Sequence, residues 1–355
     1  MQARSANSAS RLAMRYDSTV SNPSSPTVAN RERAMGTDRN DKPPLRVIFM
    51  GTPAFAVPAL DALLDANCDI IGVYTQPDRR SGRGRRLTAP PVKQAAVERD
   101  LPVFQPSSLR RDKDARLHIA SLAPDLIVVV AYGLFLPSDT LAVPSLGALN
   151  IHPSLLPRHR GPSPVATAIL EGDASTGVTI MQLDEGMDSG PVIAQRETTI
   201  GGDETAEDLT IRLFDMGAGL LADTIHPWQD GEIAPAPQNE ADATITRLLK
   251  REDGTIDWSH SAEQIARQIR AYYPWPGSFS HWRDRQLKVH EASALDRIES
   301  ELPGTVTELP QGIAVATGEG ALLLRRVQIE GRQATDISDF VRGYRDFVGS
   351  LLGTS

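Results

Sequence analysis

The sequence predicts a doubly wound α/β domain followed by a small β-barrel domain. Three observations lead to this prediction. Apolar runs alternate with helical spacings from Leu45 to about residue 230, a Pro- and Ala-rich stretch occupies 231–244, and short strand-like segments follow it. Alternating strands and helices are typical of a parallel sheet covered by helices, and close strands with Gly turns are typical of small barrels. We therefore expect a first domain at 45–230, a linker at 231–244 and a second domain at 245–355.

The first domain shows the expected alternation in order. Continuous or near-continuous apolar runs predict strands at 46–50, 69–75, 125–131, 147–152 and 177–183. The run at 125–131 is apolar almost throughout, as in a strand buried on both faces of a parallel sheet. Helical spacing predicts helices that begin at Val57, near Pro90 and near Thr205. Sites of such sheets lie beyond the carboxyl ends of the strands.

The second domain begins with a helix and continues with strands. Ile265 and Ile269 lie one helical turn apart and predict a helix at 262–272. Short β-like segments follow at 286–292, 304–309, 312–317 and 321–330. Glycines separate several of them, which favours tight turns and a small barrel.

Composition indicates an ordinary soluble protein. The chain has 355 residues, of which 40% are hydrophobic and 23% charged, and its net charge is -8. No apolar run approaches the length of a membrane span. Cys68 is the only cysteine, which excludes an internal disulfide and a cysteine-based zinc site and fits a reducing, cytoplasmic location. Residues 1–44 have few bulky apolar residues and are predicted to be disordered; a targeting segment, or a later start at Met35, remains an alternative.

Two polar residues at the end of a predicted strand suggest a site. Asn150 and His152 are two residues apart, so they point to the same side of the strand. Asp188 follows the next strand, in a loop where Gly186 and Gly190 permit sharp turns. If the two strands are neighbours, an amide, an imidazole and a carboxylate converge and can stabilise an oxyanion and move protons. The alternative is structural: Asn150 caps a turn and His152 packs beneath the proline-rich loop.

An arginine-rich loop is the clearest phosphate-binding candidate. The stretch "DRRSGRGRR" carries five arginines, and its two glycines give it flexibility; the arginines are Arg79, Arg80, Arg83, Arg85 and Arg86. In an acidic protein, such a local cluster fits contact with a nucleic-acid backbone. A solvated surface loop is the alternative. A dinucleotide site is not indicated, because the first strand is followed by the lone Gly51 and not by a Gly-x-Gly-x-x-Gly pattern.

Several motifs together resemble the formyltransferase family that uses 10-formyltetrahydrofolate. The resemblance is closest to its members that act on methionyl-tRNA and runs from about Leu45 into the C-terminal region. It rests on the motifs "GTPAFAVPALDALL", "TQPDRRSGRGRRL", "PVKQAA", "VVVAYGLFLP", "LNIHPSLLPRHRG", "GVTIMQLDEGMDSG" and "AYYPWPGS".

The resemblance implies a Rossmann-like first domain, an OB-like barrel and formyl transfer to the methionyl initiator tRNA for translation initiation. Asn150, His152 and Asp188 match the family's catalytic set. Asn150 and a protonated His152 would stabilise the oxyanion, and Asp188 would orient His152 and help to remove the amine proton. The segment that matches the border of the folate site is Ser154, Leu155, Leu156 and Pro157. The arginine loop and the barrel would hold the tRNA, 10-formyltetrahydrofolate would be the co-substrate, and no metal and a monomeric protein are expected.

Two departures from the family pattern and three rival functions remain. The family often has Gly-Ala-Ala-Pro where this chain has Gly161-Pro162-Ser163-Pro164, and often has Pro at the position of Arg80. An aminosugar-nucleotide formyltransferase would share the catalytic set but has no need of five arginines. A glycinamide ribonucleotide formyltransferase would end near the linker. A non-catalytic RNA-binding protein on the same fold is the rival from another class.

Overall fold

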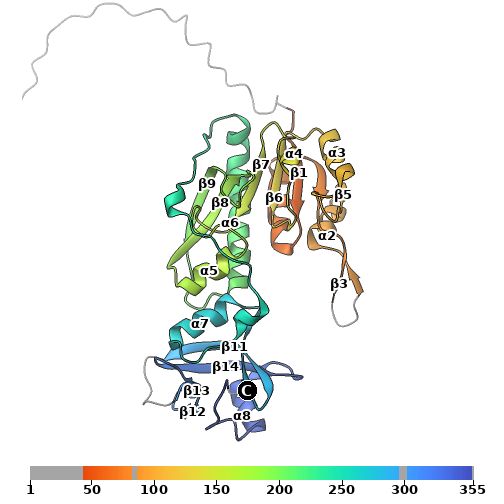
Figure 1. The fold of residues 1–355 in the computed structure, drawn as a ribbon. Helices are drawn as coiled ribbons and strands as arrows, with labels where there is room; N and C mark the ends of the chain where they lie inside the picture. The colour runs from red at the N-terminus through yellow and green to blue at the C-terminus, as the bar shows by residue number, and fades with distance from the viewer. Residues whose placement is uncertain (1–42, 82–85, 296–301, 354–355) are drawn as a thin grey trace, which may run out of the picture. The chain divides into compact units, whose positions relative to one another are not determined.

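The structure, a computed structural model, describes residues 43–81, 86–295 and 302–353 (Figure 1). Of the segment predicted to be disordered, 1–44, all but the last two residues lie outside the described residues. The described chain forms a seven-stranded sheet, a six-stranded sheet and a two-stranded hairpin, together with helices that cover the sheets.

The strands are β1 Arg46–Gly51, β2 Asp69–Tyr74, β3 Arg79–Ser81, β4 Arg86–Thr88, β5 Val103–Phe104, β6 Leu126–Val130, β7 Ala148–His152, β8 Ser175–Gln182, β9 Val192–Thr199, β10 Ser278–Trp282, β11 Arg285–Leu295, β12 Val306–Leu309, β13 Gly312–Ala316, β14 Ala321–Ile329 and β15 Thr335–Asp336. The α-helices are α1 Val57–Asp65, α2 Pro91–Glu98, α3 Lys113–Ser121, α4 Ser138–Leu141, α5 Pro164–Glu171, α6 Ala206–Gln229, α7 Ala262–Ala271 and α8 Ile337–Gly343.

The first sheet has the strand order β5–β2–β1–β6–β7–β8–β9. The pairs from β5 to β7 are parallel, which confirms the predicted parallel α/β sheet. β8 and β9 are added in antiparallel fashion. Because β8 runs back along β7, its last residue pairs with Leu149 near the start of β7, and His152 at the end of β7 pairs with Thr179.

Successive residues of the central strands enter two different apolar clusters. Phe49 belongs to the cluster packed against α1 and α6, whereas Met50 belongs to the cluster on the opposite face. The same alternation directs Ile151 of β7 towards α6. Asn150 and His152, its neighbours in sequence, therefore face away from α6, on the side of the sheet that carries the candidate site.

Helix α6 is the longest helix of the described residues and packs on β7, β8 and β9 (Figure 1). Its predicted start near Thr205 is confirmed, and the Thr205 hydroxyl caps the helix by accepting a hydrogen bond from the Asp208 N–H at 3.2 Å. Its buried face includes Leu209, Leu213 and Leu220, as helical spacing predicts. Across the described ranges, no helix is both long enough and apolar enough to cross a bilayer.

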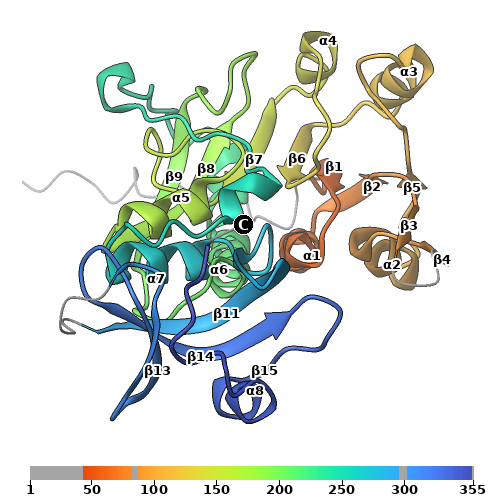
Figure 2. The ribbon, with the colours of Figure 1, turned by 60° about the horizontal axis from the view of Figure 1, so that its bottom comes forward.

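The second sheet is antiparallel throughout, with the order β10–β11–β14–β13–β12 and β15 paired to β14. Figure 2 shows its central pair, β11 and β14, side by side. The four predicted strands are confirmed as β11 to β14. The predicted small barrel is not confirmed: within the described residues no pairing joins β10 to β12, so the structure shows an antiparallel sheet.

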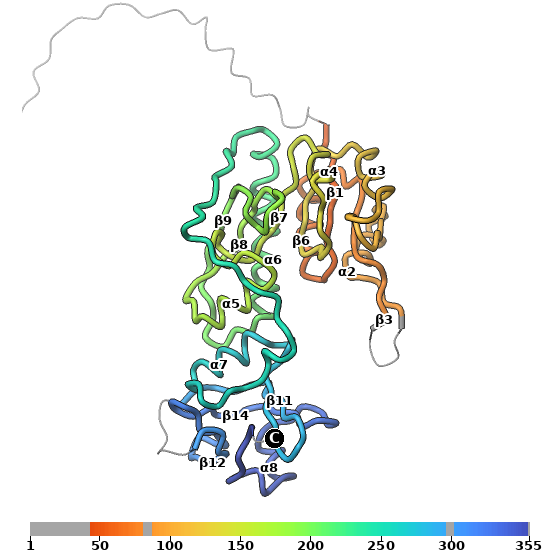
Figure 3. The backbone as a smooth tube through the Cα atoms, viewed as in Figure 1, coloured from red at the N-terminus to blue at the C-terminus, as the bar shows by residue number. Residues whose placement is uncertain are grey.

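The chain between the two sheets runs back over the first one. Ala236 forms a bridge with Val192 at the start of β9, and Ile245 forms a bridge with Arg160 in the loop after β7. The backbone can be followed along this path in Figure 3. Helix α7 then packs against α5, in an apolar cluster that includes Ile169 of α5 and Tyr272 at the end of α7.

Close packing between α6 and β7 gives a stability prediction. A Cβ atom at Gly217 would lie 2.6 Å from Ile151 Cγ2 and 3.0 Å from Val178 Cγ2, too close for either methyl group. Gly217→Ala should therefore lower the free energy of unfolding by about 1–3 kcal/mol, the usual cost of overpacking a core. Denaturant unfolding measures this difference.

The matched control is in the same helix. A Cβ atom at Gly219 meets only Arg196 Nη1, at 3.8 Å. Gly219→Ala should raise the free energy of unfolding by up to about 1 kcal/mol, because alanine favours the helix. Equal effects of the two substitutions would show that α6 does not rest on Ile151 as closely as the structure indicates.

Candidate active site

Asn150 and His152 lie on one face of β7, at its carboxyl end. His152 is buried, with 4% of its surface exposed, and Asn150 is partly exposed. The Asn150 side-chain amide has no hydrogen-bond partner among the described residues. It can therefore donate both N–H groups to a bound molecule.

The His152 ring is held by a backbone carbonyl. Its Nε2 lies 3.0 Å from the carbonyl oxygen of His159. Because a carbonyl only accepts hydrogen bonds, the hydrogen-bond network assigns a proton to Nε2. The other nitrogen, Nδ1, lies 3.7 Å from Asp188 Oδ2, which is too long for a direct hydrogen bond.

Burial decides the charge of this ring. It lowers the pKa of His152, and the facing Asp188 carboxylate and the bond to the His159 carbonyl offset only part of that effect. The free protein therefore holds a neutral ring at neutral pH, with a lone pair on Nδ1. The protonated His152 expected from the sequence is therefore not the form that burial favours in the free protein.

Asp188 reaches His152 from the loop between β8 and β9. Its Oδ2 accepts a hydrogen bond from the Gly161 N–H at 2.8 Å, and its own carbonyl accepts one from the Gln238 amide at 2.8 Å. Gly190 closes the loop, since a Cβ there would lie 1.9 Å from the Gln182 carbonyl oxygen. β7 and β8 are neighbours, as the sequence prediction required, and because they are antiparallel the loop after β8 folds back to bring Asp188 to His152.

The residues predicted to border the folate site hold the loop after β7 against β8 and β9. Ser154 and Leu156 are buried. The Thr179 hydroxyl donates to the Ser154 carbonyl at 2.6 Å, and the Gln195 amide donates to the Leu156 carbonyl at 2.8 Å. Leu155 packs beside Gly177 of β8. Only Leu155 and Pro157 of this segment are partly exposed, and their contact with folate stays a prediction.

The connection between the two sheets is bonded to the same loop. The buried Arg160 guanidinium donates to both carboxylate oxygens of Glu240, at 2.8 and 3.0 Å, and to the Gln238 side-chain oxygen at 3.0 Å. This contact holds the pKa of Glu240 below its usual value. The Arg160 backbone pairs with Thr244 and Thr246. The segment predicted as a linker is therefore hydrogen-bonded along the loop that carries His159 and Arg160.

Sequence reasoning missed these supporting residues. The only available signal was the position of His159 and Arg160 in a rigid loop among four prolines, because a stiff loop can hold buried polar groups in place. Nothing in the linker composition distinguished Gln238 or Thr244. Their partners lie 50 and 85 residues away in sequence and become neighbours only through the fold.

The arginine-rich stretch forms a hairpin whose base is anchored. Arg79 and Arg80 lie on β3 and are exposed, and Arg86 begins β4; Arg83 and Arg85 lie outside the described residues. Just before β3, Asp78 pairs with Lys93 at 2.9 Å and accepts from the Gln105 amide at 2.8 Å. These two contacts hold the pKa of Asp78 below its usual value.

Two family models match separate parts of the chain. The Formyl transferase family matches residues 45–225, and the Formyl transferase C-terminal domain matches residues 248–345. The fold and the site thus define a two-domain formyl transferase. Methionyl-tRNA formyltransferase of Roseiflexus sp. (strain RS-1) is 50% identical over 312 residues, 87% of this chain and 96% of that protein. The methionyl-tRNA formyltransferase of Marinobacter nauticus is 46% identical over 300 residues, which are 84% of this chain and 96% of that protein. The chain belongs to the methionyl-tRNA formyltransferase family.

Solved structures share the fold at low identity. The N-formyltransferase of Helicobacter canadensis, in complex with folinic acid and dTDP-3-aminofucose, is 16% identical with a TM-score of 0.61, covering 79% of this chain and 98% of that one. HypX of Aquifex aeolicus, in complex with tetrahydrofolic acid, is 18% identical with a TM-score of 0.57, and the match covers 86% of this chain. The chain spans only 48% of the length of HypX.

The geometry around His152 gives a spectroscopic prediction. In an NMR titration, His152 should titrate below the ordinary value of 6.5, because burial disfavours its charged form. Asp188→Asn should lower the pKa further, since the Asp188 carboxylate is the main group that raises it. Asp184→Asn is the control in the same loop, because Asp184 bonds to Ser189 and Gly186 and not to the ring. A His152 pKa above 6.5, or one that Asp188→Asn leaves unchanged, would contradict this description.

Proposed function

We propose that this protein transfers the formyl group of 10-formyltetrahydrofolate to the α-amino group of the methionyl initiator tRNA. One observation carries the proposal: an unpartnered Asn150 amide and a neutral His152 ring facing Asp188 lie at one end of β7. This set can perform acyl transfer without a covalent nucleophile, as long as the acceptor is itself an amine. The relatives named methionyl-tRNA formyltransferase support this acceptor.

The proposed chemistry assigns a different task to each of the three side chains. The amine attacks the formyl carbon, and the carbonyl oxygen, which becomes negative, accepts from the Asn150 amide. The amine proton passes to His152 Nδ1, and the Asp188 carboxylate, 3.7 Å away, stabilises the resulting imidazolium. When the bond between the formyl carbon and the folate nitrogen breaks, that nitrogen takes the proton, and the ring is neutral again.

The rest of the chain is proposed to bind the two substrates. The proposed border of the folate site consists of Ser154, Leu155, Leu156 and Pro157, of which Leu155 and Pro157 are partly exposed. The arginine hairpin of the 45–230 domain and an OB-like second domain at 245–355, reached through the connection 231–244, hold the tRNA. The second sheet supports the OB-like assignment by its antiparallel order and by the register shifts in long β11. The protein acts as a cytoplasmic monomer.

The deciding experiment is formylation of charged methionyl-tRNA by the purified protein. Uncharged tRNA and an aminosugar nucleotide serve as controls. Activity with the aminosugar nucleotide alone would favour the rival function. The sugar formyltransferase structures share the fold at 16% identity and do not by themselves support that acceptor.

The role of Asn150 leads to a kinetic prediction. Asn150→Ala should lower kcat by about two to three orders of magnitude, the usual cost of losing one oxyanion donor, with KM for formyl-folate little changed. Asn150→Asp, which keeps the shape but replaces the donor by an acceptor, should be at least as inactive. Near-normal kcat in either variant would reduce Asn150 to a structural residue of β7.

The arginine hairpin leads to a prediction about salt dependence. Arg80 is exposed on β3, and its guanidinium has no partner among the described residues. If it contacts a tRNA phosphate, Arg80→Ala should raise KM for charged tRNA and reduce the slope of log affinity against log salt by about 0.7–0.9. The KM for formyl-folate should stay near that of the parent protein.

A charge-matched control separates this contact from a general charge effect. Arg110 is an exposed arginine of the same domain, and Arg110→Ala should leave the salt slope unchanged. Replacement of all five arginines of the stretch provides the full test. An unchanged salt slope and tRNA KM in that variant would remove the hairpin from the tRNA site.

A further inference from the structure

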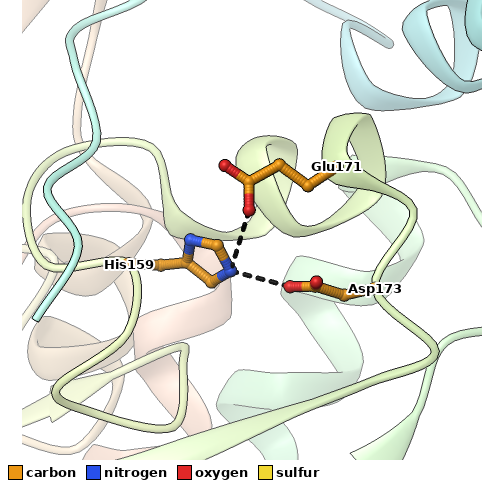
Figure 4. A group of neighbouring side chains, drawn as sticks. All are labelled: His159, Glu171 and Asp173. Atoms are coloured by element: carbon orange, nitrogen blue, oxygen red, sulfur yellow. Dashed lines mark hydrogen bonds and ion pairs between the residues drawn. The ribbon is translucent and has the colours of Figure 1, made fainter. Parts of the chain in front are cut away.

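His159 is a buried, backbone-strained residue behind the His152 ring. It is 3% exposed, and its φ of +58° lies in the left-handed region. Its Nε2 lies 2.7 Å from Asp173 Oδ2 (Figure 4). Its backbone N–H donates to the Thr244 hydroxyl at 2.8 Å. A histidine is costly to hold in this conformation, so the surrounding bonds must keep it there.

The peptide group that follows His159 links two other segments of the chain. Its carbonyl oxygen accepts from His152 Nε2 at 3.0 Å, and its N–H, which belongs to Arg160, donates to the Thr244 carbonyl at 2.9 Å. Hydrogen bonds in such a series polarise one another. The carbonyl that accepts from His152 Nε2 belongs to His159, and the side chain of His159 is held by Asp173. The orientation of this carbonyl therefore depends on His159.

The same cluster has the composition of a metal site, but its contacts indicate an ion-pair cluster. Donor atoms of His159, Glu171 and Asp173 lie within 4.8 Å of one another. The Arg158 guanidinium, however, lies 2.9 Å from the Asp173 carboxylate and 3.6 Å from the Glu171 carboxylate, so a cation already neutralises both. His159 Nδ1 has no partner in the described chain and is directed away from Asp173 (Figure 4).

We propose that Asp173 and His159 are positioning residues for His152. The Asp173 carboxylate holds the His159 side chain, and His159 in turn holds its own carbonyl against His152 Nε2. This arrangement keeps the His152 proton on Nε2 and leaves Nδ1 free to accept the proton of the attacking amine. The inference rests on the proposed function for its chemistry, but the arrangement of the ring can be measured without substrate.

The first test is NMR of the substrate-free protein. Asp173→Asn should weaken the grip on His159, so the nitrogen shifts of His152 should show a mixture of tautomers in place of the Nε2–H form. The pKa of His152 should also fall, because the bond to the His159 carbonyl raises it. Glu171→Gln removes the same charge from the same cluster at 4.0 Å from His159 Nε2, and should leave both readouts unchanged.

The second test is kinetic. Asp173→Asn and His159→Leu should each lower kcat about five- to tenfold, the worth of one hydrogen bond of about 1 kcal/mol, with little change in either KM. His159→Gln retains an N–H near the Nε2 position and should recover most of the loss. Melting temperatures identify any variant that fails to fold, and the NMR readout of Asp173→Asn then decides.

Three outcomes would overturn the proposal. The first is an unchanged His152 tautomer in Asp173→Asn. The second is an equal change in Glu171→Gln, which would point to charge alone. The third is loss of activity on chelation with recovery on Zn²⁺ addition, which would make the cluster a metal site. If the parent protein does not formylate methionyl-tRNA but the NMR differences between the variants are found, the proposed function fails. The positioning of His152 by Asp173 and His159 then still stands.

Discussion

The geometry of the candidate site depends on the peptide group between His159 and Arg160. Its carbonyl accepts from the buried His152 ring, and its N–H donates to the Thr244 carbonyl. A buried polar group left without a partner costs about 1–3 kcal/mol, so neither bond is easily given up. One peptide plane thus fixes both the direction of the ring and the path of the chain that leads to the second sheet.

Hydrogen bonds around this peptide group hold two residues of the candidate site in strained backbone conformations. His159 and Asp188 both have positive φ, at +58° and +51°, where side chains cost roughly 1–2 kcal/mol. Asp173 and Thr244 hold the first, and Gly161 and Gln238 hold the second. Strain of this kind persists where the surroundings fix it, and it concentrates at functional sites.

Local pattern in the sequence predicted the strands and the pair on β7, because a strand's alternation is a short-range property. Asn150 and His152 share a face for that reason alone. The approach of Asp188 was predicted on the condition that the two strands are neighbours, which β7 and β8 are. The antiparallel direction of β8 was not predicted, since it is set by pairing with β7 and β9 and not by the residues of β8 alone. The antiparallel sheet, the β3–β4 hairpin base and the contacts of Gln238 depend on partners far away in sequence, which periodicity does not register.

The connection between the sheets has a larger part in the site than its composition suggests. Gln238 donates to the carbonyls of Asp188 and Gly190 and accepts from Arg160, so one amide bonds the loops on both sides of the His152 ring. Thr244, six residues later, orients the carbonyl at Nε2 through Arg160. The two environments that decide where the His152 proton resides, a carbonyl at Nε2 and a carboxylate at Nδ1, are therefore set by one short segment outside the sheet. A displacement of that segment would change both environments together, and this makes the connection part of the candidate site in physical terms.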